Sequence, residues 1–249
     1  MEDIAPKLIE DIEKAFKAKT RESRILKSKL LRLKDKDADF KDASEFAQEL
    51  GNLLSEVFGQ EIKEELLPDG KMYYNIAQRL VNIMLGEDFE LINKYAKEVQ
   101  RVLNKNAGLS LKPLGTKLNQ DRIDGIVNRL AEAEKFSDVA WILKEPVVNF
   151  SMAIVDDVIK ENADFHYNAG LSPKIIRRES GSCCDWCREI VGVYNYPDVP
   201  KDVYRRHRYC KCTVEYIPGD GKKQDIWSKE WTPINKKEDI KRRIDLSKS

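Results

Sequence analysis

Residues 184–187 read CDWC and residues 207–212 read HRYCKC, and these two stretches decide the character of the C-terminal part of the chain. Two cysteines separated by two residues can turn back onto a single metal ion, with each sulfur about 2.3 Å from it. The second stretch supplies an imidazole and two more thiols. The two stretches therefore predict a tetrahedral metal site with one half on each.

All five cysteines of the 249-residue chain fall between residues 183 and 212. The N-terminus lacks the basic segment, apolar core and cleavage site of a secretory signal. We therefore expect the protein to remain inside the cell or to be packaged there, where thiols stay reduced. Clustered cysteines in such a compartment favour a structural zinc site, with a disulfide framework or a metal-free thiol cluster as the alternatives.

The predicted site has more candidate ligands than a tetrahedral ion can take. Those expected in every version are Cys184, Cys187 and Cys210. The spacing leaves open whether His207 or Cys212 is the fourth. Cys183 adjoins Cys184, so we expect it to point away from the ion, as a small buried apolar residue or a free thiol.

The residues around the cysteines offer no catalytic partner for a metal. A zinc deaminase needs His-x-Glu followed by Pro-Cys-x-x-Cys, and no His-x-Glu precedes Cys184. The chain has two histidines; one is a candidate ligand, and His166 is expected at a helix end as a packed or capping residue. Phosphate loops, nucleophile elbows and metalloprotease helices are also missing from the sequence. We therefore expect a protein that is not an enzyme.

The first 170 residues carry apolar side chains at three- and four-residue spacing, which predicts helices packed around a core. Residues 42–58 are expected to start with a capping box of Asp42 and Glu45 and to end at Gly59. Gly86 is expected to separate two further helices. Residues 1–38 are more charged and predict a solvated helical arm.

After Gly170 the pattern changes to short runs rich in Ile, Val, Tyr and Thr, which predict strands at 174–178, 190–196 and 213–217. The fold class is thus mainly α, with a small C-terminal α+β zinc-binding module. The expected units are a charged helical arm (1–38), a helical domain (39–144), the module with the Cys/His site (145–217) and a basic tail (218–249).

Charge and hydropathy limit the partners. The net charge is only +1, the mean hydropathy is −0.57, and no apolar run approaches the roughly 20 residues that span a bilayer. We expect no membrane partner and no small-molecule substrate. Any contact with nucleic acid would need a local patch, for which the candidates are Arg205, Arg206, Arg208 and Lys211 together with the lysine-rich tail. The same arginines could instead neutralise a thiolate-rich centre.

The order of motifs between residues 145 and 217 resembles that of the phage Mu F-like minor head proteins, also called the phage head morphogenesis family. The likeness rests on a helix ending in YNAG (167–170), a strand over 175–178, the CxxC and HxxCxC motifs, and a short strand at 213–214. The first 140 residues carry no motif of the family. The lead into His207 is DVYRR (202–206), whereas the family usually has a proline-rich lead there.

The resemblance implies a structural protein of a phage or prophage head, present near the portal and active in head assembly and in DNA packaging or ejection. Its implied partners are the portal protein and the major capsid protein, with DNA as a further candidate, and its implied location is the virion or the host cytoplasm. The alternative reading is a zinc-containing nucleic-acid-binding protein. A toxin or nuclease is disfavoured, because a nuclease with histidine-based metal chemistry needs more than the two histidines present, and we expect the residues after Tyr216 to be too few for a toxin domain.

Overall fold

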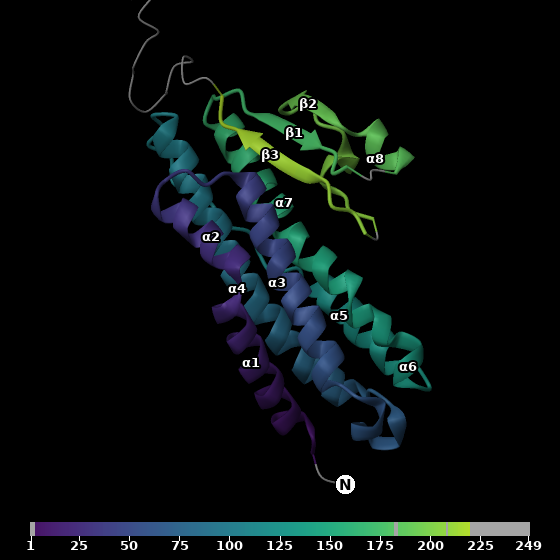
Figure 1. The fold of residues 1–249 in the computed structure, drawn as a ribbon. Helices are drawn as coiled ribbons and strands as arrows, with labels where there is room; N and C mark the ends of the chain where they lie inside the picture. Colours follow the sequence, from purple (N-terminus) through teal and green to yellow (C-terminus); the bar gives the residue numbers. More distant parts are fainter. Residues whose placement is uncertain (1–2, 182–183, 208, 220–249) are drawn as a thin grey trace, which may run out of the picture.

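A computed structural model describes residues 3–181, 184–207 and 209–219. Long helices lie side by side, and a small sheet covers one end of them (Figure 1). This arrangement confirms the predicted fold class, with a mainly helical chain, a three-stranded antiparallel sheet and a Cys/His cluster near the C-terminus. Within the described residues, no helix is both long enough and apolar enough to cross a membrane.

The charged N-terminal segment forms two helices, α1 (Ala5–Glu22) and α2 (Arg24–Lys34). Ser23 ends the first helix and begins the second, because its hydroxyl accepts a hydrogen bond from the backbone N–H of Leu26 at 3.2 Å. Ile12 and Phe16 of α1 are buried in the same hydrophobic core as the later helices. The apolar face of α1 thus packs against the bundle, whereas α2 buries Leu26 and leaves Leu30 and Leu31 exposed.

The third helix, α3 (Phe40–Glu61), begins earlier than the sequence predicts. Its N-cap is Asp39, whose carboxylate accepts the backbone N–H of Asp42, while the Asp42 carboxylate accepts the backbone N–H of Asp39. The predicted pairing of Asp42 with Glu45 was therefore wrong by three residues. The helix also continues through Gly59 for two more residues.

A single long helix, α4 (Tyr74–Asn106), replaces the two helices predicted on either side of Gly86. The prediction of a break there was wrong because the apolar positions on both sides of the glycine keep one helical register and stay buried. Two 3-10 turns, η1 (Glu64–Leu66) and η2 (Pro68–Gly70), lead into α4. The remaining elements before the sheet are α5 (Gln120–Ala131), α6 (Phe136–Val139), η3 (Ala140–Leu143) and α7 (Glu145–Asn168).

The helices α3 and α7 cross closely at Gly51. A β-carbon on Gly51 would lie 2.8 Å from the Cα of Val148 and 2.8 Å from the hydroxyl of Ser151, so only glycine fits this crossing. The Ser151 hydroxyl lies 2.6 Å from Asp88 of α4 and 3.0 Å from the carbonyl of Val147. Burial raises the pKa of Asp88 to about 7. A protonated Asp88 suits the geometry, because it can donate to Ser151 while Ser151 donates to Val147.

The sheet consists of β1 (Lys174–Arg178), β2 (Gly192–Asn195) and β3 (Thr213–Ile217), in the order β2-β1-β3. Ile175 in the central strand lies opposite Tyr194 on one side and Tyr216 on the other. The short helix α8 (Asp185–Glu189) and the 3-10 turn η4 (Lys201–Tyr204) connect the strands. Ile175 and Tyr216 share the core of the bundle, so the sheet is packed onto the helices.

Candidate metal centre

The five candidate ligands come from two turns at the end of the sheet. Cys184 is the N-cap of α8, and Cys187 lies in the first turn of that helix. His207 follows η4, and its carbonyl accepts the backbone N–H of Cys210 at 3.1 Å, which closes the second turn. Cys212 directly precedes β3. The sequence-predicted halves of the site are thus brought together.

The donor atoms form two overlapping groups of three that share Cys187. In the first, the His207 Nε2 lies 3.2 Å from the Cys184 sulfur and 3.0 Å from the Cys187 sulfur. In the second, the Cys187, Cys210 and Cys212 sulfurs all lie within 4.8 Å of one another. His207 and Cys212, the two candidates for the fourth ligand, therefore both lie close to Cys187.

The donor set fits a thiophilic metal ion. The sulfurs of Cys187 and Cys210 are 3.7 Å apart, and two thiolates on one tetrahedral zinc are separated by about 3.8 Å. Thiolates and imidazole are the ligands that zinc takes in structural sites, whereas calcium and magnesium require oxygen. The cluster could therefore bind a metal ion.

Most of the centre is screened from water. The side chains of Cys187, Cys210 and Cys212 are buried, while Cys184 is exposed. The indole of Trp186 packs against the buried cysteines and meets the His207 ring edge-on, with the ring centroids 5.6 Å apart. Burial raises the pKa of the Cys187 thiol, as do the thiols around it. Deprotonating this cluster therefore needs a positive charge close to the sulfurs, which a bound metal ion would provide.

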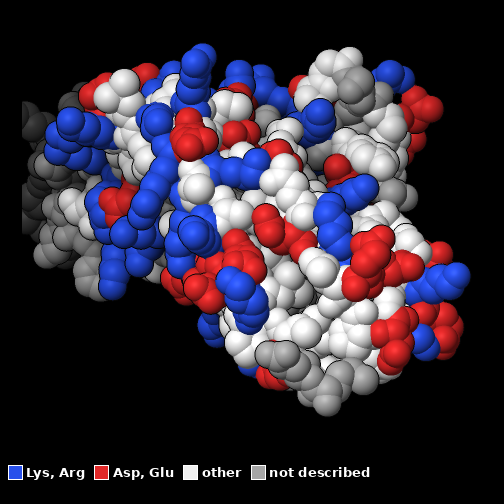
Figure 2. Space-filling view, turned by 60° about the horizontal axis from the view of Figure 1, so that its bottom comes forward, with Lys and Arg blue, Asp and Glu red and all other residues white. Residues whose placement is uncertain are grey.

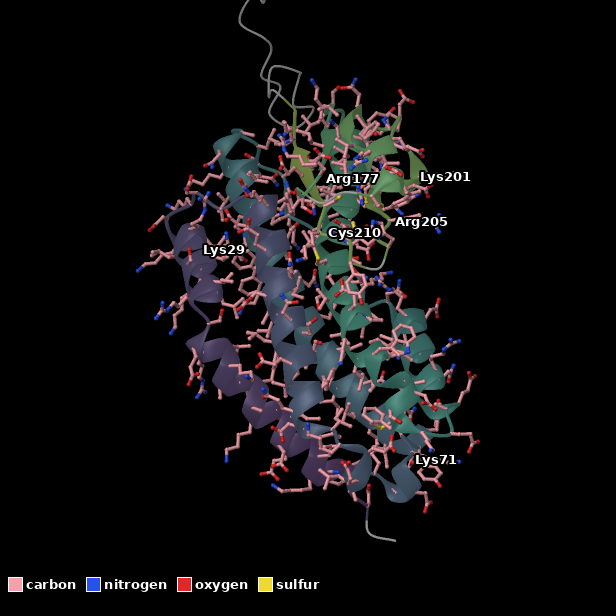
Figure 3. The ribbon with its side chains drawn as sticks, turned by 45° about the vertical axis from the view of Figure 1, so that its right-hand side comes forward. Lys29, Lys71, Arg177, Lys201, Arg205 and Cys210 are labelled. Atoms are coloured by element: carbon pink, nitrogen blue, oxygen red, sulfur yellow. The ribbon has the colours of Figure 1, made fainter. Side chains whose placement is uncertain are left out.

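The structure adds Arg177, a residue that the sequence analysis missed. Its side chain is buried, and its Nη2 lies 3.4 Å from the Cys210 sulfur and 3.9 Å from the Cys187 sulfur. Its other terminal nitrogen donates to the carbonyl of Val203. Figure 3 shows Arg177 and Cys210 close together in the upper part of the view. A positive charge thus faces two of the three buried sulfurs, those of Cys187 and Cys210.

The alternation of inward- and outward-facing residues along β1 could have indicated that Arg177 is buried. Ile175 is the inward-facing residue of β1, and a residue two positions further along a strand lies on the same face. Arg177 is therefore in phase with the core although its side chain is charged. Such a residue needs a buried partner.

The prediction that Arg206 contacts nucleic acid is wrong in this fold. Its side chain is 2% exposed and forms a two-pronged ion pair with Asp156 of α7, at 2.5 and 2.8 Å. It also donates to the carbonyl of Cys212 at 2.7 Å. Burial lowers the pKa of Arg206, but the Asp156 carboxylate outweighs this effect and raises it. Arg206 therefore ties the second ligand turn to the bundle, a role that Asn149 shares by donating to the carbonyl of His207 at 3.3 Å.

The other predicted basic residues lie in different settings. Arg205 is exposed and pairs with Asp202 at 2.9 Å, and it points away from the centre at the outer edge of the module (Figure 3). Lys211 is exposed and lines a polar cleft between the module and α3. Arg208, Cys183 and the basic tail from residue 220 onward lie outside the described residues.

His166 is packed, as the sequence predicts. Its ring is fully buried near the end of α7, and its Nδ1 is hydrogen-bonded to the hydroxyl of Tyr216. Burial lowers the pKa of His166 to about 4. The neutral ring is part of the contact between α7 and β3.

Comparisons with known proteins do not place the chain in a family: no family model, no curated protein and no solved structure matches it. The centre is thus described by its own geometry, as a Cys/His cluster on a mainly helical chain that could bind a metal ion.

Proposed function

We propose that this protein is a structural component of a phage or prophage head, acting near the portal in head morphogenesis and in DNA packaging or ejection, and that its Cys/His centre holds zinc. The observation that supports the zinc assignment most strongly is that three other sulfurs and one imidazole lie around the Cys187 sulfur, next to the buried Arg177. Zinc prefers such donors and the tetrahedral arrangement they allow.

A structural role for the zinc follows from the surplus of donors. A catalytic zinc keeps one position open for water, with three protein ligands. Here two groups of three protein donors share Cys187, and three of the four cysteines in them are buried, so five protein atoms are at hand for four positions. The zinc then stabilises the turns around α8 and β3, where a small sheet alone buries little apolar surface.

The assignment to a phage head is supported by the order of motifs in residues 145–217. The helix α7 ends at Asn168 and leads into β1, the CxxC turn, the HxxCxC turn and β3, in the order of the Mu F-like proteins. The alternative, a zinc protein that binds nucleic acid through the module, loses one of its candidate contacts because Arg206 is buried. We therefore favour contacts with head proteins.

Co-purification tests this function. The full chain, loaded with zinc, should form a complex with the portal protein or the major capsid protein encoded in the same genome. A matched sample with Cys184→Ser and Cys187→Ser tests whether the module contributes to that complex. Failure of the folded, zinc-loaded chain to associate with either protein at micromolar concentration would rule out the proposed head function.

A further inference from the structure

The N-terminal helices carry a concentration of positive charge that the small net charge of the chain conceals. Residues 14–34 contain nine Lys/Arg and one acidic residue, Glu22. They form the second half of α1 and all of α2. Figure 2 shows Lys and Arg side chains gathered on the left of the view, the side on which these helices lie in Figure 1.

Only part of this charge is neutralised within the protein. Lys29 and Arg32 pair with the buried Asp42, and Lys19 pairs with Glu56. The cations of this stretch that are exposed and form no ion pair with another described residue are Lys14, Arg21, Arg24, Lys27 and Lys34. These charges are available to a partner.

An apolar groove lies beside these cations, between α2, α3 and α4, with a volume of about 450 Å³. Its floor consists of Leu26, Leu30, Leu33, Phe46, Leu50, Leu91 and Tyr95. Two of these side chains are unusually open for leucine, since Leu30 is 52% exposed and Leu91 is 45% exposed. The rim includes Arg21, Lys27 and Lys94, whereas its one acidic residue, Glu98, is already paired with Arg101.

We propose that this groove, defined by the residues above, docks an acidic amphipathic helix of a protein partner. The apolar floor matches side chains that recur at i, i+3, i+4 and i+7 on such a helix. The unpaired rim cations match carboxylates along its polar edges, so the charge complementarity selects the partner. This inference does not depend on the metal centre or on the proposed head function.

The shape and chemistry of the groove favour a peptide over other anionic partners. A nucleic-acid backbone would meet the cations but would leave Leu30 and Leu91 against phosphate, where apolar side chains gain nothing. A flat anionic bilayer would contact the convex side of α2 and not a concave floor formed by three helices. Both alternatives are therefore outcomes that the experiment must distinguish.

The test uses the full chain and a fluorescently labelled peptide of about 18 residues, or five helical turns, with leucine along one face and glutamate along the other. We expect fluorescence anisotropy to show micromolar binding that weakens with added salt. A peptide with lysine in place of glutamate, and one with serine in place of leucine, should each bind at least about tenfold more weakly.

Two matched pairs of variants locate the binding. Leu30→Asp should weaken binding about tenfold or more, whereas Leu31→Asp should not, because Leu31 is 56% exposed and does not line the groove. Lys27→Glu should weaken binding more than Lys34→Glu, since Lys34 also lies outside the groove. Circular dichroism should show that all four variants retain the wild-type helix content.

Several results would overturn the proposal. They are equal binding of the acidic and basic peptides, equal effects of Leu30→Asp and Leu31→Asp, and a preference for duplex DNA or for phosphatidylserine vesicles over the acidic peptide at the same salt concentration. The last result would assign the surface to a nucleic acid or a membrane and not to a protein helix.

Discussion

Replacing Arg206 with methionine tests how the metal module is joined to the helices. The ion pair with Asp156 is almost fully buried, with side-chain exposures of 2% and 1%. Its loss leaves the Asp156 carboxylate without its partner in a dry environment, which typically costs about 3–5 kcal/mol. The hydrogen bond from Arg206 to the Cys212 carbonyl is lost as well, at about 1 kcal/mol.

Urea denaturation measures this cost as a decrease in the free energy of unfolding. Hydrogen exchange then locates it, and we expect the amides of residues 204–214 to exchange faster than those of α3. Arg205→Met is the matched control, because the Arg205 pair with Asp202 is exposed and contributes little. It should change stability by less than about 0.5 kcal/mol.

The double variant Asp156→Leu with Arg206→Met separates the buried charge from the lost contacts. Apolar residues of similar size often replace a buried ion pair at little cost, so the double variant should recover most of the stability lost by Arg206→Met. A loss below about 1 kcal/mol for Arg206→Met, or a double variant as unstable as the single one, would show that the buried ion pair does not join the module to the helices.

Three further predictions concern the core and the centre. Gly51→Ala should destabilise the protein by about 1–3 kcal/mol in thermal or urea unfolding, because the added β-carbon would lie 2.8 Å from atoms of Val148 and Ser151. Gly59→Ala is the control and should be neutral or stabilising, because the space around Gly59 is open. Equal effects of the two variants would contradict the close crossing of α3 and α7. Burial raises the pKa of Asp88 from 3.8 to about 7, so between these pH values the folded state keeps a proton that the unfolded chain loses. The free energy of unfolding therefore decreases as pH rises from about 4 to 7. Asp88→Asn should therefore gain stability relative to wild type over that range, by at most about 4 kcal/mol, and a difference that does not vary with pH would contradict the protonated carboxyl. Arg177→Met should speed transfer of bound zinc to a competing chelator about tenfold, whereas Arg178→Met, which breaks only an exposed pair with Glu215, should not; equal rates would remove Arg177 from the support of the centre.

The sequence predicted the parts of this fold that depend on local patterns. The three strands and the two ligand turns could be located because alternation and cysteine spacing act over a few residues. The ends of helices were less predictable: Asp42 could form a capping box with Glu45 or with Asp39, and in the structure it forms one with Asp39 and is also paired with Lys29 and Arg32 of α2.

The buried arginines mark the limit of prediction from one sequence. Nothing within the DVYRR stretch distinguishes the exposed Arg205 from the buried Arg206, because the difference is made by Asp156, 50 residues earlier on α7. The continuity of α4 through Gly86 has a similar origin, since packing against α5 and α7 outweighs the low helix propensity of one glycine. In both cases a tertiary contact decides what local preference leaves open.

The zinc content of the purified protein shows whether the Cys/His centre holds a metal ion. The protein would be purified under reducing conditions without chelators, and its zinc content would be measured together with X-ray absorption at the zinc edge. We predict about one zinc ion per chain, with sulfur as the predominant ligand at about 2.3 Å. A fully folded protein with no stoichiometric metal, or with zinc bound mainly by oxygen, would show that the Cys/His cluster is not a structural zinc site.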